Sequence, residues 1–119
     1  MKNSTTNIGQ HAEKAAWQLL ATQGFELLEK NFSCRAGEID LIVRDKKTLV
    51  FVEVRFRQNS SYGSGAETVT SAKRKRIIRT AEYYLLVNPD TANRDFRFDV
   101  ISMGSSVDWI ENAFTVNDR

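Results

Sequence analysis

The sequence has little of what builds a disulfide-stabilised or zinc-bound domain. Its 119 residues include one cysteine, Cys34, and one histidine, His11, so an internal disulfide cannot form and a zinc site is not expected. No apolar run is long enough to cross a bilayer, and residues 1–9 are polar and lack the apolar core of a signal peptide. These absences predict a cytoplasmic protein with no membrane partner.

The chain also lacks a large excess of charge of either sign. Its net charge is +2, and 41% hydrophobic and 27% charged residues are ordinary values for a soluble globular fold. We expect one domain over residues 1–119, with a loose tail over residues 1–6 and a mobile loop over residues 58–70. The charge is unevenly distributed, because five basic residues fall within two helical turns: Lys73, Arg74, Lys75, Arg76 and Arg79. Such a basic patch is typical of a surface that binds nucleic acid.

Hydrophobic periodicity predicts the order helix, three strands, helix, and one or two strands. Helical spacing covers residues 8–23 and 71–87, which are followed by Gly24 and by Asn88-Pro89-Asp90 as stop signals. Strands are expected over residues 25–32, 37–43, 50–57 and 96–103, with a closing apolar segment over residues 109–114. This order predicts an α/β layer domain.

The second and third predicted strands carry charged side chains on one face. If the intervening turn is centred on Lys46 and Lys47, Asp40 faces Glu53 and Glu38 faces Arg55. The other face is then wholly apolar and buried: Ile39, Leu41, Val43, Val50, Val52, Val54 and Phe56. A slip of one residue would mix the two sets, so the hydrophobic pattern itself selects this register. Because carboxylates opposite one another repel, a cation should lie beside them, either Arg55 or a divalent metal ion.

A third carboxylate lies on the first predicted helix. Glu13 shares one stripe of that helix with Gly9, Trp17 and Leu20, so it projects from a partly apolar face. Gly9 leaves room there for a close approach. From this position Glu13 could reach the end of the sheet that carries Asp40.

Taken singly, these residues have ordinary explanations. Charged residues on one face of a hairpin usually mark a solvated face, and a basic helix start usually marks a wet surface. Here the basic residues oppose the helix dipole, a cost that a phosphate partner would relieve. Tyr62, in the expected loop, is more often a packing residue than one that stacks on a base. The combination of acids on two strands and one helix with a basic second helix is much less common.

That combination resembles the PD-(D/E)xK nuclease motif, and the chain is similar to the YraN family of bacterial proteins. The similar segments are GEIDLI, VFVEVRFR, AETVTSAKRKRIIRTAEYYL and RFDV, and the similarity runs over residues 9–114. The resemblance implies a restriction-endonuclease-like αβββαβ core with a mixed central sheet flanked by helices. Within that superfamily the chain is most similar to archaeal Holliday-junction resolvases.

The resemblance also implies roles for individual residues. Asp40, Glu53 and the backbone carbonyl of Val54 would hold Mg²⁺ or Mn²⁺, weakly without substrate, and Glu13 would be an outer or additional ligand. Arg55 replaces the lysine of the motif. Because arginine stays protonated, it could stabilise a phosphate but could not act as a base. The expected nucleic-acid contacts are Arg57, Lys73, Arg76 and Arg79, with Glu38 and Tyr62 as secondary candidates.

The activity implied by the resemblance is metal-dependent hydrolysis of phosphodiester bonds. DNA is a more probable substrate than RNA, and branched or single-stranded DNA is expected because no base-reading element is apparent. The chain could also form a homodimer. Two alternatives stay open, a module that binds nucleic acid without cutting it and a partner-binding scaffold whose charged residues form structural ion pairs.

Overall fold

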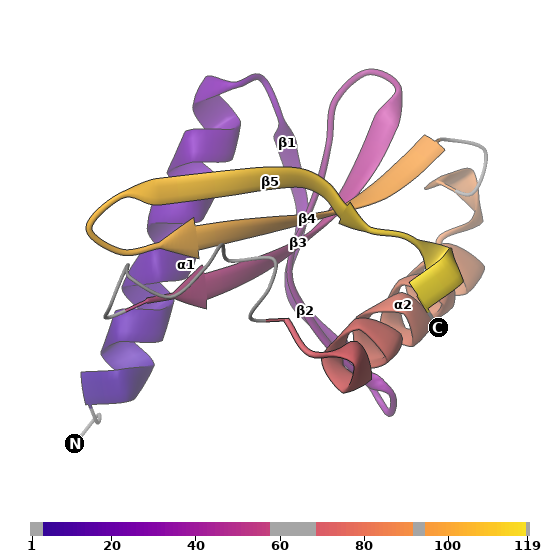
Figure 1. Ribbon diagram of the computed structural model, residues 1–119. Helices are drawn as coiled ribbons and strands as arrows, with labels where there is room; N and C mark the ends of the chain where they lie inside the picture. Colours follow the sequence, from indigo (N-terminus) through magenta and orange to yellow (C-terminus); the bar gives the residue numbers. More distant parts are fainter. Residues whose placement is uncertain (1–3, 58–68, 92–94, 119) are drawn as a thin grey trace.

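The fold is a five-stranded sheet with one helix on each face (Figure 1). The computed structural model describes residues 4–57, 69–91 and 95–118. Its elements are α1 (Ser4–Thr22), β1 (Glu26–Cys34), β2 (Gly37–Arg44), β3 (Thr48–Phe56), α2 (Ser71–Val87), β4 (Asp95–Met103) and β5 (Val107–Phe114), with short 3-10 turns η2 (Pro89–Thr91) and η3 (Val116–Asp118). The predicted order of elements is confirmed, and it agrees with an αβββαβ core.

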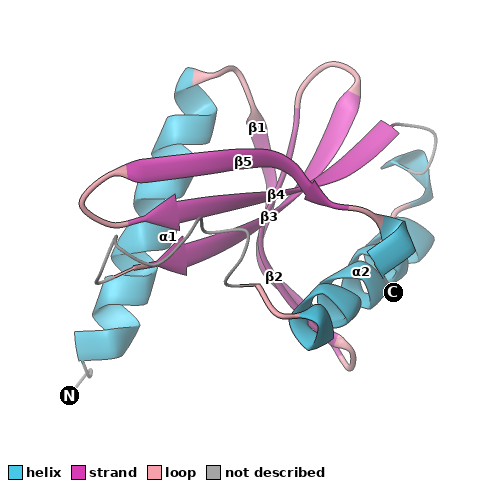
Figure 2. Cartoon of the chain, viewed as in Figure 1, coloured by secondary structure: helices cyan, strands magenta, loops and turns pink. Residues whose placement is uncertain are grey.

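The strands are arranged in the order β1-β2-β3-β4-β5. Neighbouring strands are antiparallel except β3 and β4, which are parallel and are connected through α2. A parallel pair needs such a crossover, because a tight turn can join only antiparallel strands. The predicted mixed sheet is therefore confirmed, and Figure 2 shows it lying between the two helices.

Both faces of the sheet are covered by apolar side chains from the helices. One cluster joins Ala16 and Leu20 of α1 to the strands, where it contains Leu41, Val43, Val50, Val52 and Ile101. The other joins Ile77, Ile78, Ala81 and Tyr84 of α2 to Ile39, Ile42, Leu49, Phe51 and Phe98. The face expected to carry charges is thus buried under α2 along most of its length. Only the ends of β2 and β3 farther from their turn present acidic side chains on it.

Two expected boundaries differ from the structure. Helix α1 begins at Ser4, so the loose tail predicted over residues 1–6 is wrong for residues 4–6. No glycine or proline interrupts the chain before Gly9, so the helix extends toward the N-terminus. The end of the loop predicted to be mobile is fixed, because Val69 is buried and the hydroxyl of Thr70 accepts a hydrogen bond from the Lys73 backbone N–H. Residues 58–68 lie outside the described residues.

A buried carboxylate fixes β5 against β4. Asp99 is fully buried and accepts hydrogen bonds from the guanidinium of Arg97, the indole N–H of Trp109 and the backbone N–H of Asn112. The β4–β5 register shifts between Phe98 and Val100, so Asp99 lies at this irregularity. All three donors belong to β4 or β5, which makes Asp99 a structural residue of the sheet edge.

Within the described residues, neither helix is long and apolar enough to span a bilayer.

Candidate active site at the fork between β2 and β3

Strands β2 and β3 separate after a short ladder. Their paired residues run from Arg44↔Leu49 to Leu41↔Val52, as the hydrophobic pattern predicted, and the ladder ends there. Each strand then continues with its other neighbour, β2 with β1 and β3 with β4. The two strands therefore form a fork that opens at Asp40 and Glu53.

The start of β2 lies against α2 instead of β3. At Gly37 an added Cβ would lie 3.3 Å from the Cβ of Arg76 and 3.3 Å from the Oγ1 of Thr80, so the absence of a side chain permits this approach. The predicted pairing of Glu38 with Arg55 is consequently wrong, since Glu38 is exposed and pairs with Ser33 of β1. Ile39 packs in the α2 cluster, whereas Leu41 belongs to the α1 cluster. The alternation had predicted both side chains on one face, so that prediction is wrong for Ile39.

Asp40 and Glu53 lie side by side at the fork, as the alternation predicted. The two carboxyl groups share a hydrogen bond, and Oδ2 of Asp40 also accepts one from the backbone N–H of Val54 at 2.8 Å. The Asp40 carboxyl thus binds a β3 amide beyond the last β2–β3 pair. Glu53 is 4% exposed. On the other face Val52 is buried and Val54 packs, half-buried, against the α1 cluster.

The surroundings of Asp40 disfavour its ionised form. Burial is the largest cause, followed by the negative charge of Glu53 and the hydrogen bond between the two carboxyl groups, and together they raise the pKa of Asp40 to about 8. The hydrogen bond from Val54 acts in the opposite direction but is weaker, and Glu13 adds a smaller raising effect. These surroundings favour the protonated form of Asp40.

Two cations lie beside Glu53. Nζ of Lys73 is 2.6 Å from its Oε2, and Nη1 of Arg55 is 3.8 Å from the same oxygen. Both contacts are ion pairs without hydrogen-bond geometry, since this buried oxygen has no hydrogen-bond partner among the described residues. The predicted position of Arg55 beside the acids is confirmed. The closer contact, from Lys73, was not predicted, because it depends on how α2 packs over β3.

Glu13 lies near this pair but apart from it. Burial is the main cause that raises the pKa of Glu13, a hydrogen bond with Asn31 opposes it, and the charges of Glu38 and Glu53 add to it. Glu13 lines a cavity of about 320 Å³ together with Gln10, His11, Lys14, Lys30 and Asn31. No group of three or more acidic, histidine or cysteine side chains in the described part of the chain has the spacing to hold a metal ion, so Glu13 does not complete a three-ligand cluster.

The basic residues of α2 follow the helix from the acid pair to the β1–β2 turn. Lys73 contacts Glu53, and Arg76 lies beside Gly37, three residues before Asp40 in the sequence. Arg79 lines a cavity of about 510 Å³ at the β1–β2 turn with Ser33, Cys34, Arg35, Ala36 and Tyr83. The position of Arg35 in this cavity was not predicted, because nothing in the sequence near this turn indicates that α2 packs beside it.

Comparison with known proteins shows the family of this chain. The chain matches Uncharacterised protein family UPF0102 over residues 12–103, a range that contains Glu13, Asp40, Glu53 and the basic residues of α2. The chain belongs to the UPF0102 family. It is 45% identical over 111 residues to a UPF0102 protein of Saccharophagus degradans, covering 92% of this chain and 94% of the relative. It is 48% identical over 111 residues to one from Vibrio cholerae, covering 90% and 91%. With one from Dechloromonas aromatica it shares 44% identity over 117 residues, covering 98% and 95%.

Arg57 does not join the acid pair of this UPF0102 protein. The side chain of Arg57 is 8% exposed, and its Nη2 lies 3.1 Å from Oδ2 of Asp108. Its backbone N–H donates to the carbonyl of Met103, next to Gly104, so β3 and the β4–β5 turn enclose it. The side chain of Arg57 already has an ion-pair partner, and its predicted nucleic-acid contact stays a prediction. Tyr62 lies outside the described residues.

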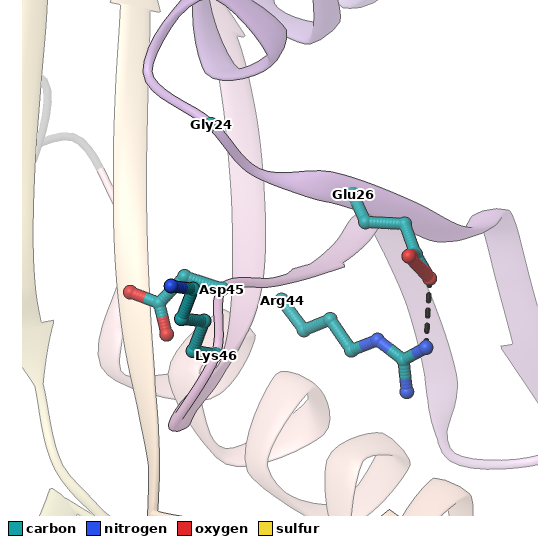
Figure 3. A pocket seen from close by; sticks show the side chains of 5 residues that line it. All are labelled: Gly24, Glu26, Arg44, Asp45 and Lys46. Atoms are coloured by element: carbon teal, nitrogen blue, oxygen red, sulfur yellow. Dashed lines mark hydrogen bonds and ion pairs between the residues drawn. The ribbon is translucent and has the colours of Figure 1, made fainter.

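A further cavity lies at the β2–β3 turn, at the opposite end of the hairpin from the fork (Figure 3). Its volume is about 310 Å³, and it is lined by Gly24, Glu26, Arg44, Asp45 and Lys46. Arg44 and Glu26 form an ion pair of 2.8 Å. Oδ1 of Asp45 accepts hydrogen bonds from the backbone N–H groups of Lys47 and Thr48. These contacts stabilise the turn. Neither Asp40 nor Glu53 lines this cavity.

Proposed function

We propose that this UPF0102 protein is a metal-dependent endonuclease that hydrolyses phosphodiester bonds in branched or single-stranded DNA. The observation that carries the proposal is the fork, where Asp40 and Glu53 are held together beside two cations. Two adjacent carboxyl groups whose ionisation is mutually unfavourable form a costly arrangement, and such arrangements concentrate at functional sites. The basic side of α2 beside the fork would bind phosphates.

The acid pair fits a divalent metal ion. Oε2 of Glu53 is buried without a hydrogen-bond partner, and the Asp40 carboxyl lies next to it. Mg²⁺ prefers hard oxygen ligands and takes one or two protein carboxylates, leaving other positions to water and phosphate. Asp40, Glu53 and the carbonyl of Val54 would hold the ion, with Glu13 outside them. When bound, the ion would neutralise charge on the phosphate and acidify a water molecule.

The chain's own residues would bind and orient the substrate. Arg55 remains protonated and lies beside the acid pair, so it would stabilise the negative charge that develops on the phosphate oxygens. Arg76 and Arg79 would contact backbone phosphates, which gives affinity without sequence preference. In the reaction a water oxygen bonds to phosphorus and loses a proton to solvent, the bond from phosphorus to one sugar oxygen breaks, and that oxygen takes up a proton.

Incubation with a panel of DNA substrates tests this proposal. A four-way junction, a nicked duplex and a single strand are incubated with Mg²⁺ or Mn²⁺, and cleavage is followed on denaturing gels. We expect cleavage of at least one substrate and a loss of about 10²-fold or more in Glu53→Gln. Asp90→Asn, an exposed acid in η2, serves as the control and should cleave normally. Absence of cleavage for every substrate with either ion would overturn the proposal.

One observation favours a second function, binding of nucleic acid without cleavage. Lys73 and Arg55 already neutralise Glu53 in the absence of a metal ion, so the site is electrostatically complete as a clamp. A non-catalytic module would retain DNA with a steep salt dependence and would show no cleavage with either ion. Retention of no nucleic acid at all would leave a scaffold with structural ion pairs.

A further inference from the structure

Lys73 holds a position that a metal ion would also need. Its ammonium group lies 2.6 Å from Oε2 of Glu53, on the oxygen that has no hydrogen-bond partner. Mg²⁺ binds carboxylate oxygens at about 2.0–2.1 Å, so the ion would need the place on Oε2 that the ammonium group takes. An ammonium group and a divalent ion on the same oxygen would repel each other strongly in this poorly solvated site.

The geometry of α2 gives Lys73 a second place to go. Lys73 lies in the first turn of α2, and its side chain is 36% exposed at the border between the fork and solvent. Its flexible four-carbon stem lets the ammonium group move while the backbone stays fixed by the Thr70 cap. Arg76 and Arg79, farther along α2, would hold a nucleic-acid backbone on that side. A phosphate there would accept the ammonium group once it leaves Glu53.

We propose that Lys73 substitutes for the metal ion at Glu53 in the metal-free protein and transfers to a phosphate of the nucleic acid when the ion binds. This inference rests on the proposed function. It makes metal and substrate binding interdependent, because each removes an obstacle to the other, and such coupling acts equally in both directions. The metal-free protein then avoids an unpaired buried carboxylate, and full metal affinity develops only on the substrate.

Titration with Mn²⁺ alone tests the competition. Lys73→Met removes the charge and retains the length of the side chain, so it should bind Mn²⁺ about tenfold or more tightly than the wild type. Lys75→Met is the matched control, because Lys75 is exposed on the same helix, and it should bind Mn²⁺ like the wild type. Lys73→Arg keeps the charge and should also bind Mn²⁺ weakly. Lys73→Gln provides the same comparison if Lys73→Met does not fold.

The salt dependence of DNA binding gives a second test of where Lys73 lies. It is measured in EDTA, so that no metal-dependent cleavage occurs. If Glu53 retains Lys73 without metal, Lys73→Met should leave the salt dependence of DNA binding unchanged, whereas Arg76→Ala should lower its slope by about 0.7–0.9. An equally large decrease in Lys73→Met would overturn the inference.

The Mn²⁺ titration separates this inference from the function on which it rests. If Glu53→Gln weakens Mn²⁺ binding but Lys73→Met does not tighten it, the inference alone fails. If Mn²⁺ binding is absent, or is unaffected by Glu53→Gln, the metal site and the inference both fail.

Discussion

At the scale of single residues, Asp40 is the side chain that the fork places in the least favourable surroundings. Its half-buried carboxyl group shares a hydrogen bond with Glu53, and its pKa rises to about 8. These surroundings favour the protonated form, so ionising Asp40 in the folded protein costs free energy. The stability of the metal-free protein should therefore depend on pH through this one group.

Asp40→Asn should remove that dependence. The pKa of Asp40 is about 8 when folded and about 3.9 when unfolded. The folded state thus binds more protons between these values, and its free energy of unfolding falls as the pH rises through this window. Asn keeps the shape and cannot ionise. In EDTA at pH 8.5 the variant should be more stable than the wild type by at least about 1 kcal/mol, whereas near pH 4 the two should match. Urea denaturation across this range measures the difference.

The control for this prediction is Asp90→Asn, which should follow the wild type at every pH because Asp90 is exposed. Added Mn²⁺ should reverse the order at pH 8.5, since the ion would compensate the charges of the wild-type pair. A destabilised Asp40→Asn in EDTA at pH 8.5 would show that ionised Asp40 is a structural partner, and the metal site would lose its main support.

The sequence predicts some of these residue contacts and not others, for a physical reason. The neighbours Asp40 and Glu53 follow from the two-residue period of a strand and the position of one turn, both of which are local. The contact of Lys73 with Glu53 depends on the packing of α2 over β3. The pairing of Arg57 with Asp108 depends on where the β4–β5 turn lies. Tertiary placement of this kind leaves no periodic signal in the sequence.

At the scale of elements, the fork is produced by the competition of α2 and β3 for the start of β2. Alternation predicts a continuous ladder, and the ladder is regular from Arg44↔Leu49 to Leu41↔Val52. Beyond it, Ile39 enters the α2 cluster and Gly37 approaches the α2 backbone. An alternation of period two fits the pairing of β2 with β3 and the packing of β2 against α2 equally well. The sequence pattern therefore could not show where β2 leaves β3.

Gly37→Val should weaken this contact between β2 and α2. The new side chain would begin 3.3 Å from both Arg76 Cβ and Thr80 Oγ1, so these neighbours must give by a few tenths of an ångström. Overpacking of this kind typically costs about 1–3 kcal/mol of unfolding free energy. Chemical denaturation measures the loss. Because the fork would change shape, any DNA cleavage should fall by more than the population of unfolded protein explains.

Gly9→Ala is the matched control for an added methyl group. A Cβ at Gly9 would meet none of the described residues within 4 Å, which also means that the close approach expected at Gly9 is not found among them. Since alanine favours a helix over glycine, this variant should gain up to about 1 kcal/mol. A Gly37→Val protein as stable as the wild type would show that α2 does not restrain the start of β2.

At the scale of the whole molecule, one sheet separates two apolar layers, and the acidic site opens where two of its strands diverge. α1 covers one face and brings Glu13 near the fork, while α2 covers the other and brings its basic side chains. Opposite charges from the two layers therefore meet at one end of the sheet. We expect a nucleic-acid backbone to lie along α2 with one phosphate at the fork.

The double variant Arg76→Ala/Arg79→Ala tests this orientation. Removing one phosphate-binding side chain should lower the slope of log affinity against log salt by about 0.9 on duplex DNA and about 0.7 on single strands. Removing two therefore predicts a decrease of about 1.4–1.8, measured by fluorescence anisotropy in EDTA on a four-way junction and on a single strand.

Lys47→Ala, at the β2–β3 turn and away from the fork, should leave the slope unchanged. Adding Lys73→Ala to the double variant should lower the slope further only when Glu53 is also changed to Gln, because Glu53 holds Lys73 in the metal-free protein. Equal slopes for the wild type and the double variant would show that DNA does not follow the basic side of α2.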